Sequence, residues 1–567
     1  MKRPLPANQY DMRDPHVLIH LKGHLFDSGL INQVLDVIEG LDCQFDIEEC
    51  NVKPREKTSL LLRVFSAEKD KLGSVVTKVK LLCDLIETAK TSMQHFDSRP
   101  QPTQSHDSDA KSKVSVLGER ERNILLLGAG KVASSFTEYV GRDKSTTVTV
   151  ASQFEHDAMS VAKNATRGKA VTCDLNLMSS TDQLRSLIRE ADVVVSLLPA
   201  QMHSNIAKEC ILSKTDLVTA SYESEEMRAL RKSSEEAGIS ILNEVGLDPG
   251  MDHMSAMKII DDIQSRGGVV KHFSSVCGGL PAPEAANNPL LYKFSWSPMG
   301  VMTASQNSAV YRRDGEIVHV PGEALLASSE QFDGFQSLNL EQLPNRDSLV
   351  YGDKYGIQSA STVYRGTLRY NGFSALLHVF KNMGLLRNTE TGAMSWKETI
   401  EKLSEEHGFH DVRSCILSCA GGNKDLACRA QRCLEWLHLN DLSVSDSSSI
   451  VRSFCDVLEQ SLAFQNGERD MVLMQHDIVA IFGDGSTETH SSSLQLFGDE
   501  SMTAMCKTVG YTCAIGTQLI LDGVVPKKGL LLPTNKEVYI PALDRLEKEG
   551  IVFDEHVQVE HDRENVV

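Results

Sequence analysis

The stretch NILLLGAGKVASSF, residues 123–136, decides the fold of this chain. An apolar run that suits a buried strand leads into a glycine turn, and the residues after the turn are typical of a helix. In such a unit Gly128 allows a tight turn, Gly130 lets backbone N–H groups approach a pyrophosphate, and Ala133 replaces the third glycine at the helix–sheet contact. A lone GxGxxA pattern is weak evidence, but an apolar strand before it and a βαβ series after it favour dinucleotide binding. The turn residues predicted to contact the dinucleotide are Gly128, Ala129, Gly130, Lys131 and Val132.

Apolar strands and helical segments alternate beyond this turn. The strands are NILLLG, TTVTVAS, KAVTCDL, ADVVVSLLP, DLVTAS and ISILNEVGL. Several of them are apolar on both faces, which indicates a parallel sheet covered by helices. We therefore predict an α/β protein with a Rossmann-type parallel-sheet domain.

The rest of the chain changes character several times, which predicts further domains. Residues 16–92 mix strand and helix signals, residues 93–121 are rich in Ser, Asp, Gln and Pro, and residues 391–465 have helical periodicity. The predicted parts are a small α+β domain (1–92), a flexible linker (93–121), the Rossmann-type dinucleotide-binding domain (122–250, completed by about 500–567), an α/β substrate domain (251–390, completed by about 466–499) and a helical insert (391–465).

Composition and charge restrict the classes of function. The 567 residues carry a formal net charge of −19, with 41% hydrophobic and 24% charged residues, and no Lys/Arg-rich run stands out. Such a chain repels a phosphate backbone, so nucleic acid is not expected as a partner. Because residues 1–40 hold no signal sequence and no apolar run approaches the length of a bilayer span, we expect no membrane partner and a cytoplasmic location.

The thirteen cysteines are expected to be reduced thiols. Their odd number, scattered along a large chain without a secretory leader, is not typical of a disulfide framework. Four of them lie close together in the sequence, at Cys415, Cys419, Cys428 and Cys433, which raises the hypothesis of a zinc site. Cys415 and Cys419 have helical i, i+4 spacing, however, and no CxxC pair occurs, so we expect buried helical thiols and no metal.

The ends of the second, third and fourth strands predict how the rest of a dinucleotide is held. At Ser152 and Gln153 there is no Arg or Lys to receive a 2′-phosphate and no acidic residue to bind a 2′-hydroxyl, so NAD is favoured over NADP without being proved. Asp174 either approaches the adenine side or caps a helix, and the loop at residues 196–199 suits the nicotinamide ribose. The predicted contacts are Ser152, Gln153, Cys173, Asp174, Ser196, Leu197, Leu198 and Pro199.

A second turn, in NEVGLDPGMDHM at residues 243–254, places a carboxylate between a strand and a helix. Pro249 and Gly250 force the turn, and apolar residues then recur at helical spacing. From the residues alone, Asp248 either caps this helix or lines a ligand crevice.

Six longer motifs occur in an order that resembles a known family. They are SYESEEM, NEVGLDPGMDH, CGGLPAPEAANNPLLYKFSW, PNRDS, RGTLRYNGF and GERDMVLMQH. Residues 122–567 resemble saccharopine dehydrogenases of the glutamate-forming kind, and with the preceding α+β unit the chain resembles the C-terminal part of the plant bifunctional lysine-ketoglutarate reductase/saccharopine dehydrogenases. The resemblance implies an oxidoreductase of lysine catabolism that uses NAD and water to cleave saccharopine into glutamate and aminoadipate semialdehyde. It also implies a reductase half of the same polypeptide as a partner.

The resemblance assigns roles to single residues as well. Tyr222, Asp248 and Cys277 are implied as the catalytic groups around the reacting nitrogen, where they position water and relay protons. His253 and His476 are rival bases, for which a core or capping role is the simpler interpretation. The implied cofactor contacts in the second turn are Asp248, Pro249 and Gly250. The implied substrate contacts are Ser221, Tyr222, Arg346, Thr367, Leu368 and Arg369, among which the arginines suit carboxylates.

Two alternatives stand beside this hypothesis. One is a catalytically silent dinucleotide-binding scaffold, and the other is the same chemistry on another amino-acid-derived secondary amine. The retained Arg346 and Arg369 argue against a silent scaffold, because a pocket freed from turnover has no physical need for paired cations. Met299 stands where the fungal relatives have an arginine, which again favours NAD.

Overall fold

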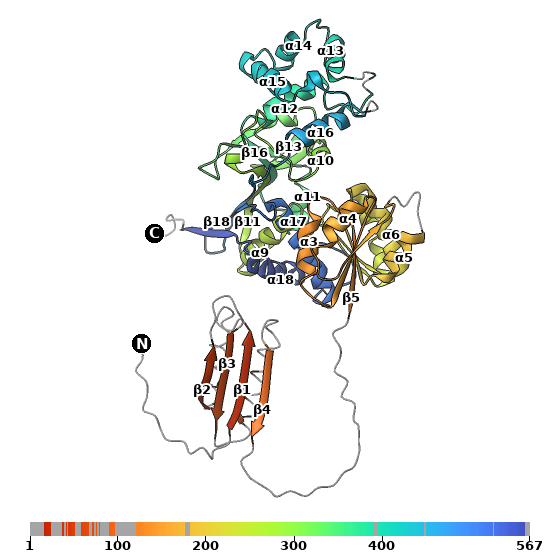
Figure 1. The fold of residues 1–567 in the computed structure, drawn as a ribbon. Coiled ribbons are helices and arrows are strands. Elements are labelled where there is room, and N and C mark those ends of the chain that lie inside the picture. Colours follow the sequence, from red (N-terminus) through yellow and green to blue (C-terminus); the bar gives the residue numbers. More distant parts are fainter. Residues whose placement is uncertain are drawn as a thin grey trace, which may run out of the picture. The chain divides into compact units, whose positions relative to one another are not determined.

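The chain forms two compact units, residues 1–115 and 116–567, in a computed structural model. The structure describes residues 121–175, 182–390, 392, 395–446, 449–525 and 527–561. Before residue 121 it describes the segments 16–23, 43–51, 58–66 and 90–96 and the single residues 34, 37, 38, 41, 71, 72, 75 and 79. Figure 1 shows the fold of each unit.

The first unit contains an antiparallel four-stranded sheet. Its strands are β1 (His16–Gly23), β2 (Gln44–Asn51), β3 (Thr58–Phe65) and β4 (Lys90–Phe96), in the order β2-β3-β1-β4. Apolar side chains of two strands, Ile19, Leu62 and Val64, are fully buried, and so is the helical residue Val34. Strand β4 occupies residues 93–96, which we expected to belong to the linker, and the linker residues 97–120 lie outside the described ones.

The second unit contains a sheet of seven parallel strands. They are β5 (Arg122–Leu127), β6 (Thr146–Ser152), β7 (Gly168–Thr172), β8 (Val193–Ser196), β9 (Asp216–Thr219), β10 (Ser240–Leu242) and β19 (Gly529–Leu531). Their order is β19-β10-β9-β8-β5-β6-β7, with all neighbours parallel. The predicted Rossmann-type fold is therefore confirmed. The order of strand addition reverses beside β5, and in open parallel sheets ligands bind in the crevice at such a point.

Helices cover both faces of this parallel sheet because successive strand residues point to opposite sides. Ile124 and Leu126 of β5 belong to one apolar core, and Leu125 and Leu127 belong to a separate one. The covering helices are α3 (Ala133–Val140), α4 (Glu155–Ala162), α5 (Asp182–Glu190), α6 (His203–Ser213), α7 (Glu225–Arg228), α8 (Arg231–Ala237) and α17 (Ala504–Leu521). The C-terminal segment adds α17 and β19 to the parallel sheet, and α18 (Lys536–Lys548) packs against α17 and α9.

A second, mixed sheet follows and holds the predicted substrate domain. Its strands are β11 (Val269–Pro281), β12 (Ala309–Arg313), β13 (Glu316–Val320), β14 (Glu330–Phe332), β15 (Leu340–Pro344), β16 (Thr362–Tyr370), β17 (Asp470–Ile481), β18 (Ser486–Phe497) and β20 (Asp554–His561). The main path is β13-β12-β16-β11-β17-β18-β20. The assignment of all of residues 500–567 to the Rossmann domain was wrong for β20, which pairs with β18 of this sheet. The helices of this part are α9 (Met251–Ser265), α10 (Pro298–Ala304) and α11 (Val350–Lys354).

The described residues of the predicted helical insert form four α-helices, which continue from α12 (Phe373–Met383). They are α13 (Trp396–Glu406), α14 (Val412–Cys419), α15 (Lys424–Trp436) and α16 (Ile450–Ser461). Trp396 and Phe454 are fully buried in their core. Cys415 and Cys419 lie one turn apart on α14, with their sulfur atoms 4.0 Å apart. Among the described residues, no group of three or more His, Cys, Asp or Glu side chains is placed to hold a metal ion, and no helix is long and apolar enough to cross a membrane.

Candidate active site

The glycine turn after β5 leaves open space on its outer side. Gly128 has a φ of 100°, and a Cβ atom there would lie 3.2 Å from the carbonyl oxygen of Leu197, so this part of the turn packs closely against the loop after β8. A Cβ atom on the exposed Gly130 would meet no atom within 4 Å. In the described part of the chain no side chain caps the N-terminus of α3, where N–H groups favour an anion. These residues fit the pyrophosphate of a dinucleotide.

Lys131 connects the same turn to the second half of the unit. Its Nζ atom lies 2.9 Å from a carboxylate oxygen of Glu459 on α16 and donates to the carbonyl oxygen of Phe294 at 3.3 Å. Both partners of the ion pair are about half exposed, so solvent screens the pair and it adds little to stability. The pair links the glycine turn to α16 of the helical insert.

The strand ends predicted to flank the adenosine lie side by side. The N–H of Cys173 donates to the carbonyl oxygen of Ser152 at 2.9 Å, and Nε2 of Gln153 donates to Oδ1 of Asp174 at 3.4 Å. Gln153 and Asp174 are exposed. This edge therefore presents an amide and a carboxylate to a ligand.

His203, at the start of α6, joins two of the predicted ligand-binding loops. Its Nδ1 atom is 3.0 Å from the hydroxyl of Ser196, and its Nε2 atom is 2.8 Å from the hydroxyl of Ser221. Burial lowers the pKa of His203 to about 4, so the ring is neutral at neutral pH and accepts one of these bonds while it donates the other. His203 thereby fixes the loop after β8 relative to the loop after β9.

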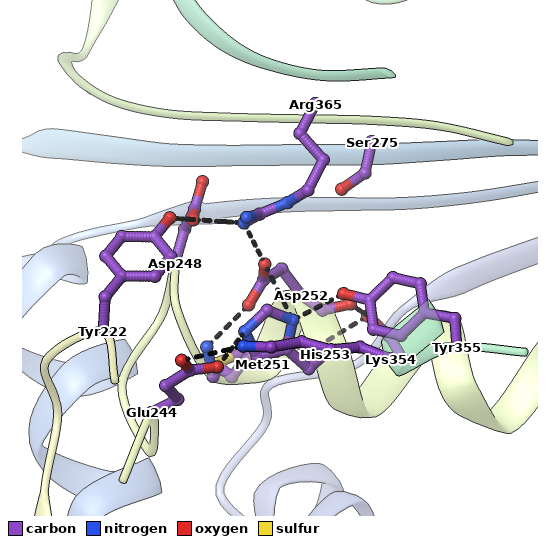
Figure 2. A network of polar contacts seen from close by, with 12 residues as sticks. Tyr222, Glu244, Asp248, Met251, Asp252, His253, Ser275, Lys354, Tyr355 and Arg365 are labelled. Carbon is purple, nitrogen blue, oxygen red and sulfur yellow. Dashed lines mark hydrogen bonds and ion pairs between the residues drawn. The ribbon is translucent and has the colours of Figure 1, made fainter. Parts of the chain in front are cut away.

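Asp248 lies in a buried cluster with Tyr222 and Arg365 (Figure 2). The Tyr222 hydroxyl donates to Oδ1 of Asp248, and Nη2 of Arg365 donates to the same oxygen at 2.5 Å. Nη2 of Arg365 is also 3.3 Å from the Tyr222 oxygen and bonds to Oδ2 of Asp252. Arg365 is only 2% exposed, so one buried guanidinium from β16 pairs with the carboxylate of Asp248, in the turn before α9, and with that of Asp252, on α9.

The turn that carries Asp248 shows why this carboxylate is not a helix cap. Gly250 precedes α9, and a Cβ atom there would lie 2.1 Å from the carbonyl oxygen of Gly246, so the turn closes tightly on itself. The N–H of Gly250 donates to Oδ1 of Asp252 at 2.6 Å. Asp252 therefore satisfies the start of α9, and Asp248 remains directed at Tyr222 and Arg365.

A second polar chain continues from Asp252 into the protein. Nδ1 of His253 is 2.5 Å from the Tyr355 hydroxyl and 3.4 Å from Oδ2 of Asp252, and Nε2 of His253 is 3.0 Å from Oε2 of Glu244. Lys354 lies 3.3 Å from the other oxygen of Glu244. Burial alone would raise the pKa of Glu244, but His253 and Lys354 outweigh it and lower this pKa to about 2. Glu244 is thus an ionised, buried carboxylate, and the ring of His253 lies between it and Asp252.

Strand β16 aligns the arginines by its period of two. Arg365, Thr367 and Arg369 share one face of the strand. Arg369 is 5% exposed, and its Nη1 atom donates to the adjacent Leu368 carbonyl oxygen at 2.7 Å. Within the described part of the chain no carboxylate lies within ion-pair distance of its guanidinium.

Aromatic rings and apolar packing surround the other predicted substrate contacts. The Arg369 guanidinium lies over the rings of Tyr292 and Phe373, at 5.3 and 5.6 Å from the centroids. Arg346 is exposed and lies 5.0 Å from the centroid of the Tyr222 ring. Leu368 is fully buried in an apolar core, so only its backbone is placed to touch a ligand.

Burial decides the protonation of three further candidates. Cys277 lies on β11 opposite Thr367, and burial raises the pKa of its thiol well above the usual value. Burial also raises the pKa of Tyr222, so both groups are protonated at neutral pH. His476 is fully buried between the hydroxyls of Ser255 and Ser275, and burial lowers its pKa to about 3. A neutral, doubly bonded ring supports the core role for His476 and not the role of a base.

Comparison with known proteins identifies the family. Residues 246–551 match the Saccharopine dehydrogenase C-terminal domain, residues 124–242 match the Saccharopine dehydrogenase NADP binding domain, and residues 16–104 match the LOR/SDH bifunctional enzyme conserved region. The chain belongs to the saccharopine dehydrogenase family. As a member of this family it contains a dinucleotide-binding domain, and the motif resemblance is confirmed.

This member of the saccharopine dehydrogenase family is similar both to longer proteins and to proteins of about the length of its second unit. An alpha-aminoadipic semialdehyde synthase from Arabidopsis thaliana is 35% identical over 94% of this chain and 54% of its own length, so the chain spans about half of that relative. The NADP(+), L-glutamate-forming saccharopine dehydrogenase of Saccharomyces cerevisiae is 38% identical over 76% of this chain and 99% of its own length. A solved structure of apo saccharopine dehydrogenase (L-Glu forming) from Saccharomyces cerevisiae is 36% identical, covers 77% of this chain and 100% of its own, and has a TM-score of 0.69.

The sequence analysis missed several residues of the polar cluster in this family member. Arg365 stands at the head of RGTLRY, and the strand period of two would have placed it on the same face as Thr367 and Arg369. Asp252 follows Asp248 by four residues, but its contact with Arg365 joins α9 to β16, far apart in the sequence, and leaves no local pattern. Glu244 has a positive φ of 61°, and this backbone conformation cannot be predicted from the sequence alone.

Proposed function

We propose that this chain oxidises saccharopine with NAD and water to glutamate, aminoadipate semialdehyde and NADH. Saccharopine carries three carboxylates and a secondary amine, so its site needs fixed cations and a proton acceptor beside a nicotinamide. The observation that carries the proposal is the buried guanidinium of Arg369, which has aromatic neighbours but no carboxylate partner in the described part of the chain. A buried cation of this kind is unfavourable by itself and becomes favourable when a ligand carboxylate binds it.

The second requirement is met on the same face of β16. Arg365 contacts Asp248 and Tyr222. On strand β16 it precedes Thr367 by two residues and Arg369 by four. A substrate carboxylate bound at Arg369 and a reacting nitrogen near Asp248 therefore lie along one strand. Arg346, over the Tyr222 ring, supplies a cation at the exposed end of the cluster.

The residues of the cluster differ in protonation state and therefore have different roles in proton transfer. When bound, the nicotinamide accepts a hydride from the substrate carbon that becomes the aldehyde. Asp248 takes the proton of the secondary ammonium, because the nitrogen lone pair must be free before that carbon can be oxidised. Tyr222, protonated at neutral pH, donates to Asp248 and orients the carboxylate. Cys277 stays a neutral thiol that shapes the apolar side of the site.

NAD is the proposed cofactor, in contrast to the NADP named for the Saccharomyces cerevisiae relative. The adenosine edge has a carboxylate at Asp174, and residues 152–162 contain no Arg or Lys. A 2′-phosphate would meet a negative charge there and no compensating cation. Met299 packs against the apolar core of the second sheet and offers no charge either.

The test is NADH or NADPH formation, followed by absorbance, with saccharopine and either NAD or NADP in parallel. We expect turnover with NAD and a kcat/KM for NADP that is lower by at least roughly tenfold, which corresponds to about 1.4 kcal/mol. Turnover with NADP alone would contradict the cofactor assignment. No turnover with saccharopine would contradict the substrate and would favour either another secondary amine or the silent scaffold.

A reductase half joined to this chain, and a cytoplasmic location, stay predictions. Two relatives named alpha-aminoadipic semialdehyde synthase are about twice as long as the matched region, and residues 16–104 match the LOR/SDH bifunctional enzyme conserved region, which supports the first. Immunodetection of the polypeptide in fractionated cells tests both, through its mass and the fraction in which it occurs.

A further inference from the structure

A cavity of about 260 Å³ lies between α9, α18 and the segment that leads into β20. Helices α9 and α18 pack against each other (Figure 1), and residues 551–553 line the cavity beside them. Its lining residues belong neither to the cluster around Asp248 nor to the glycine turn. A cavity of about 150 Å³ with apolar walls holds benzene, so this one has room for an aromatic ring with a short side chain.

The helical period of α18 gives the cavity one wall with an apolar and an acidic end. Ile540, Leu543, Asp544 and Glu547 are three or four residues apart, so they share one face of the helix, and all four line the cavity. Ile540 is 48% exposed. The apolar end of this face is therefore open to a ligand, and it lies one to two turns before the two carboxylates.

The segment after α18 adds a second apolar wall. Ile551, Val552 and Phe553 line the cavity, and Val552 is 54% exposed. The ring of Phe553 stacks on that of His476, with the centroids 6.4 Å apart, so this wall is held against β17 of the second sheet. Exposed apolar side chains around a concave surface are typical of a ligand-binding site.

The charged residues of the cavity leave two negative charges without a partner. Nζ of Lys258 on α9 lies 2.9 Å from a carboxylate oxygen of Glu555, so the charges of these two lining residues cancel. In the part of the chain that the structure describes, no ion pair or hydrogen bond joins the side chain of Asp544 or Glu547 to another group. A cationic ligand would therefore be attracted to this end of the cavity, and an anionic one would be repelled.

We propose that the cavity binds a small amphipathic ammonium ion. Its apolar body lies against Ile540, Val552 and Phe553, and its charged end lies beside Asp544 and Glu547. The apolar walls and the unpaired carboxylates are both needed for this ligand, because its body gains from leaving water while its charge stays paired. The site is separate from the one that holds Asp248, so it is an additional site of this chain.

The test is isothermal titration calorimetry of the full chain with three probes of similar shape and different charge. The probes are phenethylamine, which is a cation at neutral pH, phenethyl alcohol, which is neutral, and hydrocinnamate, which is an anion. We expect the dissociation constant of phenethylamine to be at least roughly tenfold lower than that of phenethyl alcohol, because its ammonium group bonds to carboxylates. We expect no binding of hydrocinnamate.

Substitutions on α18 separate the effect of charge from that of shape. Asp544→Asn combined with Glu547→Gln removes both charges at nearly constant volume. The dissociation constant of phenethylamine should rise by at least roughly tenfold, and that of phenethyl alcohol should stay the same. Glu401→Gln combined with Glu405→Gln is the matched control, because it removes two exposed carboxylates from α13, and it should leave both constants unchanged.

The cluster around Asp248 also suits an amine, so the titrations are repeated with Asp248→Asn. Phenethylamine should still bind to this variant with the dissociation constant of the cavity. Binding that is lost in Asp248→Asn, or that is insensitive to the double substitution on α18, would overturn the proposal. So would hydrocinnamate that binds as tightly as phenethylamine, or phenethylamine that does not bind at millimolar concentration. None of these titrations depends on turnover, so failure of the proposed oxidation of saccharopine would leave their outcome unchanged.

Discussion

Replacing Arg369 by methionine tests whether this arginine binds a ligand or stabilises the fold. Methionine keeps much of the volume of the side chain and removes its charge. In the free protein, the variant loses the bond to the Leu368 carbonyl and the contacts with Tyr292 and Phe373, which together stabilise by about 2–3 kcal/mol. It also removes a buried charge without a carboxylate partner, which is unfavourable by several kcal/mol. The free energy of unfolding should therefore stay the same or rise.

Saccharopine binding should change in the opposite direction. A charge-assisted hydrogen bond to a carboxylate stabilises by about 1.5–3 kcal/mol. At about 1.4 kcal/mol for each factor of ten, the saccharopine KM should rise by roughly 10- to 150-fold. The KM for NAD should change little, because Arg369 lies on β16 of the second sheet and not at the glycine turn.

The assay is initial-rate NADH formation with one substrate varied at a saturating level of the other, together with thermal unfolding of the free protein. Arg313→Met is the matched control, because Arg313 also lies over two aromatic rings of the same sheet, Tyr311 and Tyr364, but is paired with Glu330. We expect unchanged KM values for the control. A lower melting temperature for Arg369→Met with an unchanged saccharopine KM would refute the reasoning and make Arg369 a structural residue.

Three other predictions follow from the same geometry. Asp248→Asn should lower kcat by about 10²- to 10⁴-fold with an unchanged NAD dissociation constant in a fluorescence titration, and near-normal kcat would show that Asp248 only orients Tyr222. Burial lowers the pKa of His476 from 6.5 to about 3, so unfolding takes up a proton below pH 6.5 and stability is lost as the pH falls. In His476→Asn the slope of the unfolding free energy between pH 6 and 4, measured by urea titration, should be smaller by about 1.4 kcal/mol per pH unit, and an unchanged slope would contradict the buried neutral ring. Gln153→Arg should raise the ratio of kcat/KM for NADP to that for NAD by at least about tenfold, whereas a constant ratio would place the 2′-position elsewhere.

The parallel sheet could be predicted because its signals are local. The apolar strands, the glycine turn at Gly128 and the helical spacing between them are each contained in a short window of sequence. The placement of β20 could not be predicted in this way. Its residues alternate polar groups with only two valines, and its partner β18 is more than fifty residues away, so pairing and not local pattern decides its sheet.

The candidate site was predictable residue by residue but not as an arrangement. Asp248 lies in a motif that predicts a turn, and Arg369 lies in a motif that predicts a strand. Their connection runs through Arg365, whose contacts reach residues more than one hundred positions away. The contacts of this buried guanidinium form where β16 meets α9 and the turn before it, and the periodicity of neither segment predicts them.

The charges of this network suit the substrate that the proposal assigns to it. The chain of contacts from Lys354 through Glu244, His253, Asp252 and Arg365 to Asp248 contains three carboxylates but only two side chains with a fixed positive charge, so the carboxylates exceed the lysine and arginine cations by one negative charge. A secondary ammonium bound beside Asp248 cancels that charge, and transfer of its proton to Asp248 leaves the sum at zero. Proton transfer therefore creates no net charge inside the protein, where an uncompensated charge is most unfavourable. A neutral or anionic ligand bound beside Asp248 would leave the excess negative charge uncompensated. This is a physical reason for the site to select an amine.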